Sequence, residues 1–327
     1  MNLFVFEWVS GGGLAGEPLP PALAREGDMM VRALLCDLAE LPGVRAATSR
    51  DPRLPPIAGM PAIVPEPGED PLALYARGVA AADAAWPTAP ETGGALERLA
   101  RATLDLGVTL LGCHPDAVRL TTSKRATALA LRAAGVPVIP TFGAGDRLPP
   151  LPGPWVVKPD DGAGCEDTHV VPDWRAAAER LALDPARSVA QPWIAGCPAS
   201  LSLVCRDGRA ELLCGNRQHV RVVACRPTLA AITVNGVTDP HGRLAELARR
   251  IAAAVPGLWG YVGVDLVLTD AGAPVVLEIN PRLTTSYCGL RRAAGINAAA
   301  RVLDAPGGPE AGTATPVLLE LEPDDGD

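Results

Sequence analysis

An aspartate, a glutamate and an asparagine have types and a spacing that could bind a metal ion. Asp265 lies in one apolar run, and Glu278 and Asn280 end the next, with Asp270-Ala271-Gly272 as the turn between the runs. In a hairpin around this turn, the two carboxylates come close to opposite each other. They would repel unless a cation lay between them, and magnesium prefers such oxygen ligands, completed by water and nucleotide phosphate. Two solvent-facing acids on an alternating strand are the alternative.

Two lysines and a glycine-containing loop could bind a phosphate chain. Lys158 ends an apolar run, and Gly162 and Gly164 follow it. Glycines let backbone N–H groups turn toward oxyanions, and a lysine supplies a point charge. Lys124 stands in the first turn of an expected helix. The alternatives are a surface turn at Lys158 and a solvated helix face at Lys124. The chain has no Walker A sequence, and the glycines 11–13 do not form a dinucleotide fingerprint.

A broken apolar strand could bind an adenine ring. Gln191 opens the segment Gln191-Pro192-Trp193-Ile194, in which the proline interrupts the run. Such a break exposes backbone N–H and C=O groups of Trp193 and Ile194, which can hydrogen-bond the edge of a base. Because proline donates no ladder hydrogen bond, the segment is expected at an edge or a hinge. A plain edge strand without a ligand is the alternative.

The secondary-structure elements that must position these residues differ between the first third of the chain and the rest. The first third alternates strand and helix, the pattern of a parallel α/β lobe, with expected strands at 3–6 and 108–111 and helices at 26–41 and 95–106. A helix is expected at 121–134, capped by Thr121 or Thr122. Hairpins are expected around Asp207-Gly208 and around residues 270–272, with a helix at 243–254 between them. We expect lobes at 1–118, 119–195 and 196–305, followed by a mobile acidic tail at 306–327.

Composition excludes some classes of function. The 327 residues carry a net charge of −8, which argues against a nucleic-acid-binding protein. None of the eight cysteines forms a C-x-x-C pair, so we expect reduced thiols. The N-terminus has no basic region typical of a signal peptide, and no apolar run is long enough to cross a bilayer. A cytoplasmic protein with no membrane or nucleic-acid partner is therefore expected.

The order of these motifs resembles the ATP-grasp superfamily of carboxylate–amine ligases over residues 121–287. The resemblance implies an α/β fold, α+β in its C-terminal half, in which a parallel N-terminal lobe precedes two α+β lobes that clamp ATP. It implies magnesium, or manganese in its place, as the second cofactor. The implied roles are phosphate contacts from the lysines and the glycine loop, adenine contacts from 191–194, metal ligation by Asp265, Glu278 and Asn280, and transition-state stabilisation by Arg282.

A narrower resemblance covers nearly the whole chain. Val5-Phe6-Glu7 with the glycines 11–13, the segment 26–30 and the segment Gly215-Asn216-Arg217-Gln218 are similar to tyramine–L-glutamate ligases of methanofuran-type cofactor synthesis. This resemblance implies that the γ-carboxylate of glutamate is joined to tyramine. It places Glu7 near the amine, Asn216 at the substrate, and Arg217 at the phosphates or the substrate carboxylate as a second catalytic arginine.

Three positions depart from the superfamily pattern. Gln191 stands where many members have glutamate, Pro198 where a ribose-binding glutamate is common, and Gly263 where several members have arginine. Arg217 or Arg282 would have to supply that last charge. The expected partners are small molecules, an amino acid and an amine, and a homodimer is compatible with the sequence. The alternatives are another ATP-grasp amino-acid or peptide ligase and a non-catalytic nucleotide-binding regulator.

Overall fold

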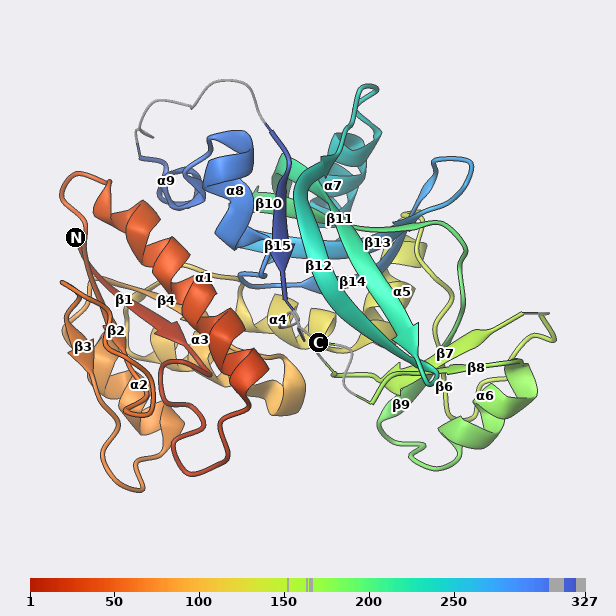
Figure 1. The fold of residues 1–327 in the computed structure, drawn as a ribbon, viewed down its shortest axis with the longest axis horizontal. Coiled ribbons are helices and arrows are strands. Elements are labelled where there is room, and N and C mark those ends of the chain that lie inside the picture. Colours follow the sequence, from red (N-terminus) through yellow and green to blue (C-terminus); the bar gives the residue numbers. More distant parts are fainter. Residues whose placement is uncertain (152, 163, 165–166, 306–314, 322–327) are drawn as a thin grey trace, which may run out of the picture.

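The computed structural model describes residues 1–327 except 152, 163, 165–166, 306–314 and 322–327. Its N-terminal part is a five-stranded parallel sheet in the order β3-β2-β1-β4-β5 (Figure 1). The strands are β1 (Asn2–Glu7), β2 (Arg45–Ser49), β3 (Ala62–Ile63), β4 (Ala84–Thr88) and β5 (Thr109–Leu110). Both faces of β1 are buried, since Phe4 and Phe6 pack with Tyr75 while Leu3 and Val5 pack against another apolar cluster. A continuous apolar run is typical of a parallel strand covered on both faces.

Helices α1 (Pro21–Ala39), α2 (Pro71–Val79) and α3 (Ala95–Asp105) cover this sheet. Helix α1 begins five residues before the predicted start at residue 26, with Pro21 in its first turn. A proline is compatible with that position, because the backbone N–H groups of the first turn have no acceptor within the helix. Asp37 is a polar residue on the apolar face of α1. It is 6% exposed and accepts a 2.7 Å hydrogen bond from Tyr287 Oη in the C-terminal part. This hydrogen bond therefore connects α1 of the N-terminal part with the C-terminal part that contains Tyr287.

The helix predicted at 121–134 is two helices. Helix α4 (Pro115–Thr122) ends before Ser123, and α5 (Lys124–Ala133) begins after it. Ser123 is the N-cap of α5, since its side chain accepts a 3.0 Å hydrogen bond from Ala126 N. The prediction of Thr121 or Thr122 as the cap is wrong, because both hydroxyls bond backward to carbonyls of α4. Lys124 is thus the first residue of α5, and the cap at Ser123 fixes the backbone from which its side chain extends.

The second part is a four-stranded antiparallel sheet in the order β6-β9-β7-β8 with one helix, α6 (Trp174–Leu181). Its strands are β6 (Phe142–Gly143), β7 (Trp155–Pro159), β8 (His169–Val171) and β9 (Ser188–Pro192). The segment with Pro192 was predicted at an edge or a hinge; β9 as a whole lies between β6 and β7, but at Pro192 it has a neighbour only in β7 among the described residues. Pro192 is tolerated there because the two residues of β6 pair only with Ala190 and Val189, so β6 does not reach the proline.

The third part is a six-stranded sheet in the order β14-β13-β10-β11-β12-β15. Its elements are β10 (Cys197–Arg206), β11 (Arg209–Val223), β12 (Arg226–Val237), α7 (Arg243–Ala254), β13 (Gly260–Leu268), β14 (Pro274–Asn280), α8 (Tyr287–Ala294), α9 (Ala298–Leu303) and β15 (Val317–Glu320). Both predicted hairpins and helix α7 are confirmed. Within the predicted mobile tail, residues 317–320 instead form β15, which pairs with the edge of β12.

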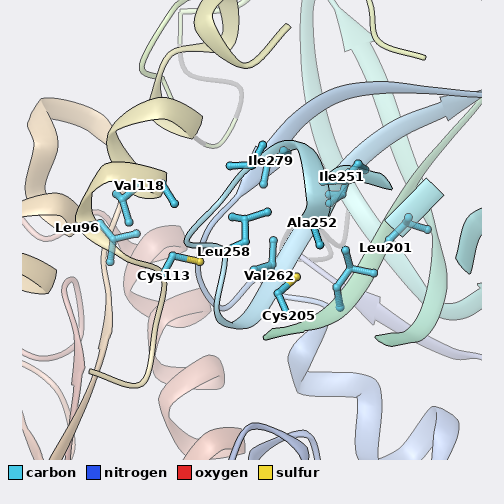
Figure 2. Packing of buried hydrophobic residues seen from close by; sticks show 14 of the residues in the cluster. Leu96, Cys113, Val118, Leu201, Cys205, Ile251, Ala252, Leu258, Val262 and Ile279 are labelled. Atoms are coloured by element: carbon cyan, nitrogen blue, oxygen red, sulfur yellow. The ribbon is translucent and has the colours of Figure 1, made fainter. Parts of the chain in front are cut away.

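The core continues from the N-terminal part into the large sheet. Figure 2 shows Leu96 and Val118 near Cys113, Leu258 and Ile279, with Val262, Ile251 and Leu201 further along the same apolar cluster. One face of β10, β13 and β14 therefore lies in this cluster. On the other face, Val204 and Tyr261 pack in a second apolar cluster with α8 and α9, and polar side chains such as Asp265 and Glu278 lie further along the same face. Among the described helices, none has both the length and the apolar character needed to span a membrane.

Candidate active site

The predicted acidic pair lies on the face of the large sheet opposite the apolar cluster of Figure 2. In the β13–β14 ladder, Asp265 pairs directly with Glu278, and Gly263 pairs with Asn280. Asn280 Nδ2 donates a 3.0 Å hydrogen bond to Asp265 Oδ2. Gln218 Nε2 donates a 2.9 Å hydrogen bond to Asp265 Oδ1. The structure therefore brings the three predicted metal ligands together and fixes the Asp265 carboxylate from both sides.

Both predicted lysines point at the same carboxylate. Lys158 Nζ, from the end of β7, lies 3.2 Å from Glu278 Oε2, and Lys124 Nζ, from the start of α5, lies 3.8 Å from it. Lys124 is only 5% exposed and also donates a 2.6 Å hydrogen bond to Gly162 O. It therefore holds the glycine loop beside the acids, and Gly164 in that loop has the positive φ of +65° that glycine adopts readily.

The charges of this cluster act strongly on each other. Burial and the neighbouring Glu278 carboxylate raise the pKa of Asp265 to about 7. Burial also works to raise the pKa of Glu278, but the charges of Lys158, Lys124 and Arg282 hold it at about 2. Asp265 thus has the raised pKa of a carboxylate that is close to another acid and would be stabilised by a cation.

The donor set fits a magnesium ion that is shared with a phosphate chain. It offers two carboxylates and one side-chain amide, all hard oxygen donors, and the Asn280 hydrogen bond to Asp265 uses Nδ2 and leaves Oδ1 as a donor to the ion. Within the part of the chain that the structure describes, no group of three or more His, Cys, Asp or Glu could hold an ion. The remaining ligands would therefore come from water and phosphate, as is usual for magnesium.

Arg282 forms a buried, two-pronged ion pair with Glu91. Its Nε lies 2.9 Å from Glu91 Oε1 and its Nη2 lies 3.0 Å from Oε2. Nη1 donates to Leu283 O at 3.1 Å. The side chains are 15% and 7% exposed, so water screens the pair little. Glu91 comes from the loop after β4, and the N-terminal sheet thereby reaches the site.

Two predicted residues of β11 lie elsewhere. Arg217 is exposed and pairs with Ala199, whose other neighbour is Leu266, so its side chain shares their face and not the face of Asp265. Asn216 is on the Asp265 face but is 0% exposed, and its Nδ2 lies within hydrogen-bond distance of the Ser200 and Ser202 hydroxyls. The structure therefore does not bring Arg217 into the cluster, and Asn216 organises the sheet.

Glu7 is also held inside the protein. Its carboxylate oxygens accept hydrogen bonds from Val9 N at 3.2 Å and Ser10 N at 2.7 Å, and it is 4% exposed. Burial raises the pKa of Glu7 despite these bonds and the charge of Arg282. A Cβ at Gly27 would clash with Glu7 Oε2, so a larger residue at that position of α1 would displace the Glu7 carboxylate. Glu7 thus orders the loop after β1.

The predicted adenine segment lies where β9 leaves the small sheet. Gln191 is 2% exposed, and its Nε2 donates a 2.9 Å hydrogen bond to Thr141 Oγ1. Trp193 is 40% exposed, but its backbone N–H already donates to Pro154 O at 2.9 Å. Ile194 is half-buried and outside the strand. Among these residues, Ile194 is therefore the better placed to offer backbone groups to a base.

Sequence reasoning missed Gln218 and Glu91 as site residues. Gln218 had a usable signal, because side chains two residues apart in a strand share a face, so Gln218 and Asn216 point away from Arg217. Glu91 had a weaker signal. It follows a buried parallel strand, and functional residues gather at the carboxyl ends of such strands.

Family comparisons match most of the chain. The model of the ATP-grasp domain matches residues 121–286, and the model of the pre ATP-grasp 3 domain matches residues 44–118. The first range contains both lysines, the glycine loop and the acidic pair.

Three individual relatives have low sequence identity to this chain. A curated tyramine–L-glutamate ligase from Methanocaldococcus jannaschii is 28% identical over 209 residues, which are 64% of this chain and 58% of that protein. An ATP-grasp superfamily protein from Archaeoglobus fulgidus has a similar structure, with a TM-score of 0.73 at 23% identity over 98% of this chain and all of that one. An L-amino acid ligase from Bacillus licheniformis gives 0.64 at 18% identity over 92% and 73% of the two chains. These two structures share the fold of this chain.

Proposed function

The chain belongs to the ATP-grasp family, and on that premise we propose that it is an ATP-dependent ligase that joins a carboxylate to an amine with release of ADP and phosphate. The observation that carries the proposal is the meeting of Lys124 and Lys158 with Glu278, beside Asp265 and Asn280. Cations for a phosphate chain and oxygen donors for magnesium lie within one half-buried cluster. We propose ATP and magnesium, or manganese, as its cofactors.

The reaction needs an activated acid. A carboxylate does not react with an amine at neutral pH, because its leaving group would be oxide. We propose that a carboxylate oxygen attacks the γ-phosphorus of ATP, that the bond to the bridging oxygen breaks, and that its electron pair leaves on ADP. The amine then attacks the acyl carbon, loses a proton and displaces inorganic phosphate. Both steps depend mainly on positioning and on charge neutralisation.

The residues of the chain divide this work. Lys124 and Lys158 would neutralise phosphate charge as the bridging bond breaks, and Lys124 would keep the glycine loop over the phosphates through its bond to Gly162 O. Asp265, Glu278 and Asn280 would hold magnesium, which supplies further charge neutralisation when bound. Arg282 would stabilise the phosphoryl group in transfer. Closure of the glycine loop would exclude water, which otherwise hydrolyses an acyl phosphate.

The substrate pair that we propose is the γ-carboxylate of L-glutamate with tyramine or a similar amine. Support comes from the curated relative, which is named for this pair, although this chain spans 58% of its length. The test is ADP release with ATP, magnesium and L-glutamate, with and without tyramine, followed by the product mass. ADP that depends on both substrates, with the mass of glutamyl-tyramine, supports the pair; ADP release with other amino acids or amines only would reject it and keep the ligase.

A second candidate is a ligase for two amino acids. The observation that favours it is the shared fold with an L-amino acid ligase over 92% of this chain. The same assay with pairs of amino acids separates the candidates, because a dipeptide product would replace the glutamyl amide. A regulator that binds nucleotide without turnover would release no ADP with any pair.

A further inference from the structure

All three parts of the protein meet at Glu91 and the short 3-10 helix η1 (Thr92–Gly94), which follow β4 in the N-terminal part. Glu91 binds Arg282 of the large-sheet part. Thr92 Oγ1 donates to Asp161 O at 3.2 Å, and Gly93 N donates to Asp161 Oδ2 at 3.3 Å, so the next two residues hold the glycine loop of the small-sheet part. Gly93 and Gly94 have φ of +63° and +71°, a turn that favours glycine.

The ion pair leaves a defined part of Arg282 for a ligand. A guanidinium has five N–H donors. Three are used within the described residues: Nε and one N–H of Nη2 by Glu91, and one N–H of Nη1 by Leu283 O. One N–H therefore remains on each terminal nitrogen, and two such donors can bind a phosphate or carboxylate in the two-pronged manner that arginine favours.

The buried Glu91 carboxylate fixes the orientation of the Arg282 guanidinium. Arg282 carries a long flexible side chain, which on a surface would sample several rotamers. Here a carboxylate that is 7% exposed holds two of its nitrogens at once. A two-pronged bond fixes both the position and the plane of the guanidinium, whereas a single charge nearby would fix neither.

We propose that Glu91 is the positioning residue of Arg282: it binds one edge of the guanidinium and aims the two remaining N–H groups at the phosphoryl group in transfer. The proposal rests on the phosphoryl transfer from ATP that is the first step of the function proposed above, because only a transferred phosphoryl group gives these donors their task. Glu91 itself touches neither nucleotide nor substrate in this scheme. Its effect must therefore pass through Arg282 and must be largest when charge is spread over the moving phosphoryl group.

The test compares the binding of magnesium ADP alone with that of magnesium ADP and aluminium fluoride, a mimic of the phosphoryl group in transfer, by calorimetry. Wild type should bind the fluoride complex more tightly than ADP. Glu91→Ala should lose about 10- to 100-fold of that preference, the scale of a misplaced catalytic group, while its affinity for ADP alone changes by less than about twofold. Glu91→Gln, which keeps one acceptor and is the milder change for folding, should lie between the two.

A matched control is available in the N-terminal part. Glu69 binds Arg77 through the same atoms, with Nε to Oε1 at 3.0 Å and Nη2 to Oε2 at 2.8 Å, and that pair contacts none of the site residues. Glu69→Ala should leave the fluoride preference unchanged. In an Arg282→Ala background, Glu91→Ala should cost less than about twofold more, because two residues that act as one unit are not additive.

Each result has one reading. Equal losses for ADP and for the fluoride complex, an additive loss in the Arg282→Ala background, or a loss of preference in Glu69→Ala would overturn the positioning role. A fluoride preference that depends on Glu91 supports it, even if no carboxylate–amine pair yields a product. In that case the proposed ligase reaction falls and the role of Glu91 remains.

Discussion

Replacement of Asp37 by asparagine should stabilise the protein at neutral pH. The Asp37 carboxylate is 6% exposed and accepts a hydrogen bond from Tyr287 Oη. Burial raises its pKa from 3.8 to about 6, despite the Tyr287 bond and the charge of Arg291. An acid with a raised folded pKa binds more protons in the folded than in the unfolded state. Stability is therefore lost as pH rises from the unfolded pKa to the folded one, and the penalty is complete above about pH 6.

The size of the effect follows from the same pKa. Each pKa unit corresponds to about 1.4 kcal/mol, so the penalty at neutral pH is at most ~3 kcal/mol, with about half of it left near pH 5. Asparagine removes the buried charge and keeps an oxygen for the Tyr287 hydroxyl. Asp37→Asn should thus gain up to ~3 kcal/mol in unfolding free energy at about pH 7.5 and clearly less near pH 5.

Urea unfolding of both proteins at the two pH values measures this difference. Asp105→Asn, at the exposed end of α3, is the matched control and should change stability by less than about 0.5 kcal/mol. A variant that is less stable than wild type at neutral pH would refute the reasoning. So would an equal gain at both pH values, because a titrating carboxylate cannot produce it.

The other predictions concern the site. Asp265→Asn should lower ADP formation at least about 100-fold, because the metal set loses one carboxylate. It should not lower the unfolding midpoint, because a carboxyl with a raised pKa is removed; steady-state rates and thermal unfolding check both. Lys158→Met should raise the KM for ATP at least about tenfold, since a phosphate contact is lost, as an ATP titration of the rate would show. Gln218→Ala should lower the rate about tenfold through Asp265, while Arg217→Ala should stay within about twofold; equal losses would contradict the assignment of faces in β11.

Local signals made much of the fold predictable from the sequence. Asp207-Gly208 marks a tight hairpin turn, and the structure has both residues at positive φ, 49° and 72°. The boundary at Ser123 was missed, because the break between α4 and α5 is one residue long and both sides read as helix. The strand 317–320 was missed because its partner β12 lies about 85 residues earlier, beyond the reach of local pattern.

In the candidate site, too, the features set by neighbouring residues were predictable and those set by distant contacts were not. The closeness of Asp265 and Glu278 was predictable, because the turn between their strands sets the approximate register of the hairpin. Their direct pairing was not, because it depends on a register shift between Asp265 and Leu266; without that shift Asp265 would pair with Leu277. The face of β11 on which Arg217 lies was not predictable. A shift of one residue moves every side chain of a strand to the opposite face, and the pairing of β11 is irregular at 215–217. Glu91 lies 191 residues from Arg282, so only the folded chain shows their contact.

The most direct test of the central claim follows the oxygen of the acid. L-glutamate labelled with ¹⁸O in its γ-carboxylate is incubated with the protein, ATP, magnesium and tyramine, and the inorganic phosphate is analysed by mass. A ligase that works through an acyl phosphate transfers one labelled oxygen to each phosphate released along with ADP and amide. Unlabelled phosphate, or AMP in place of ADP, would contradict the account.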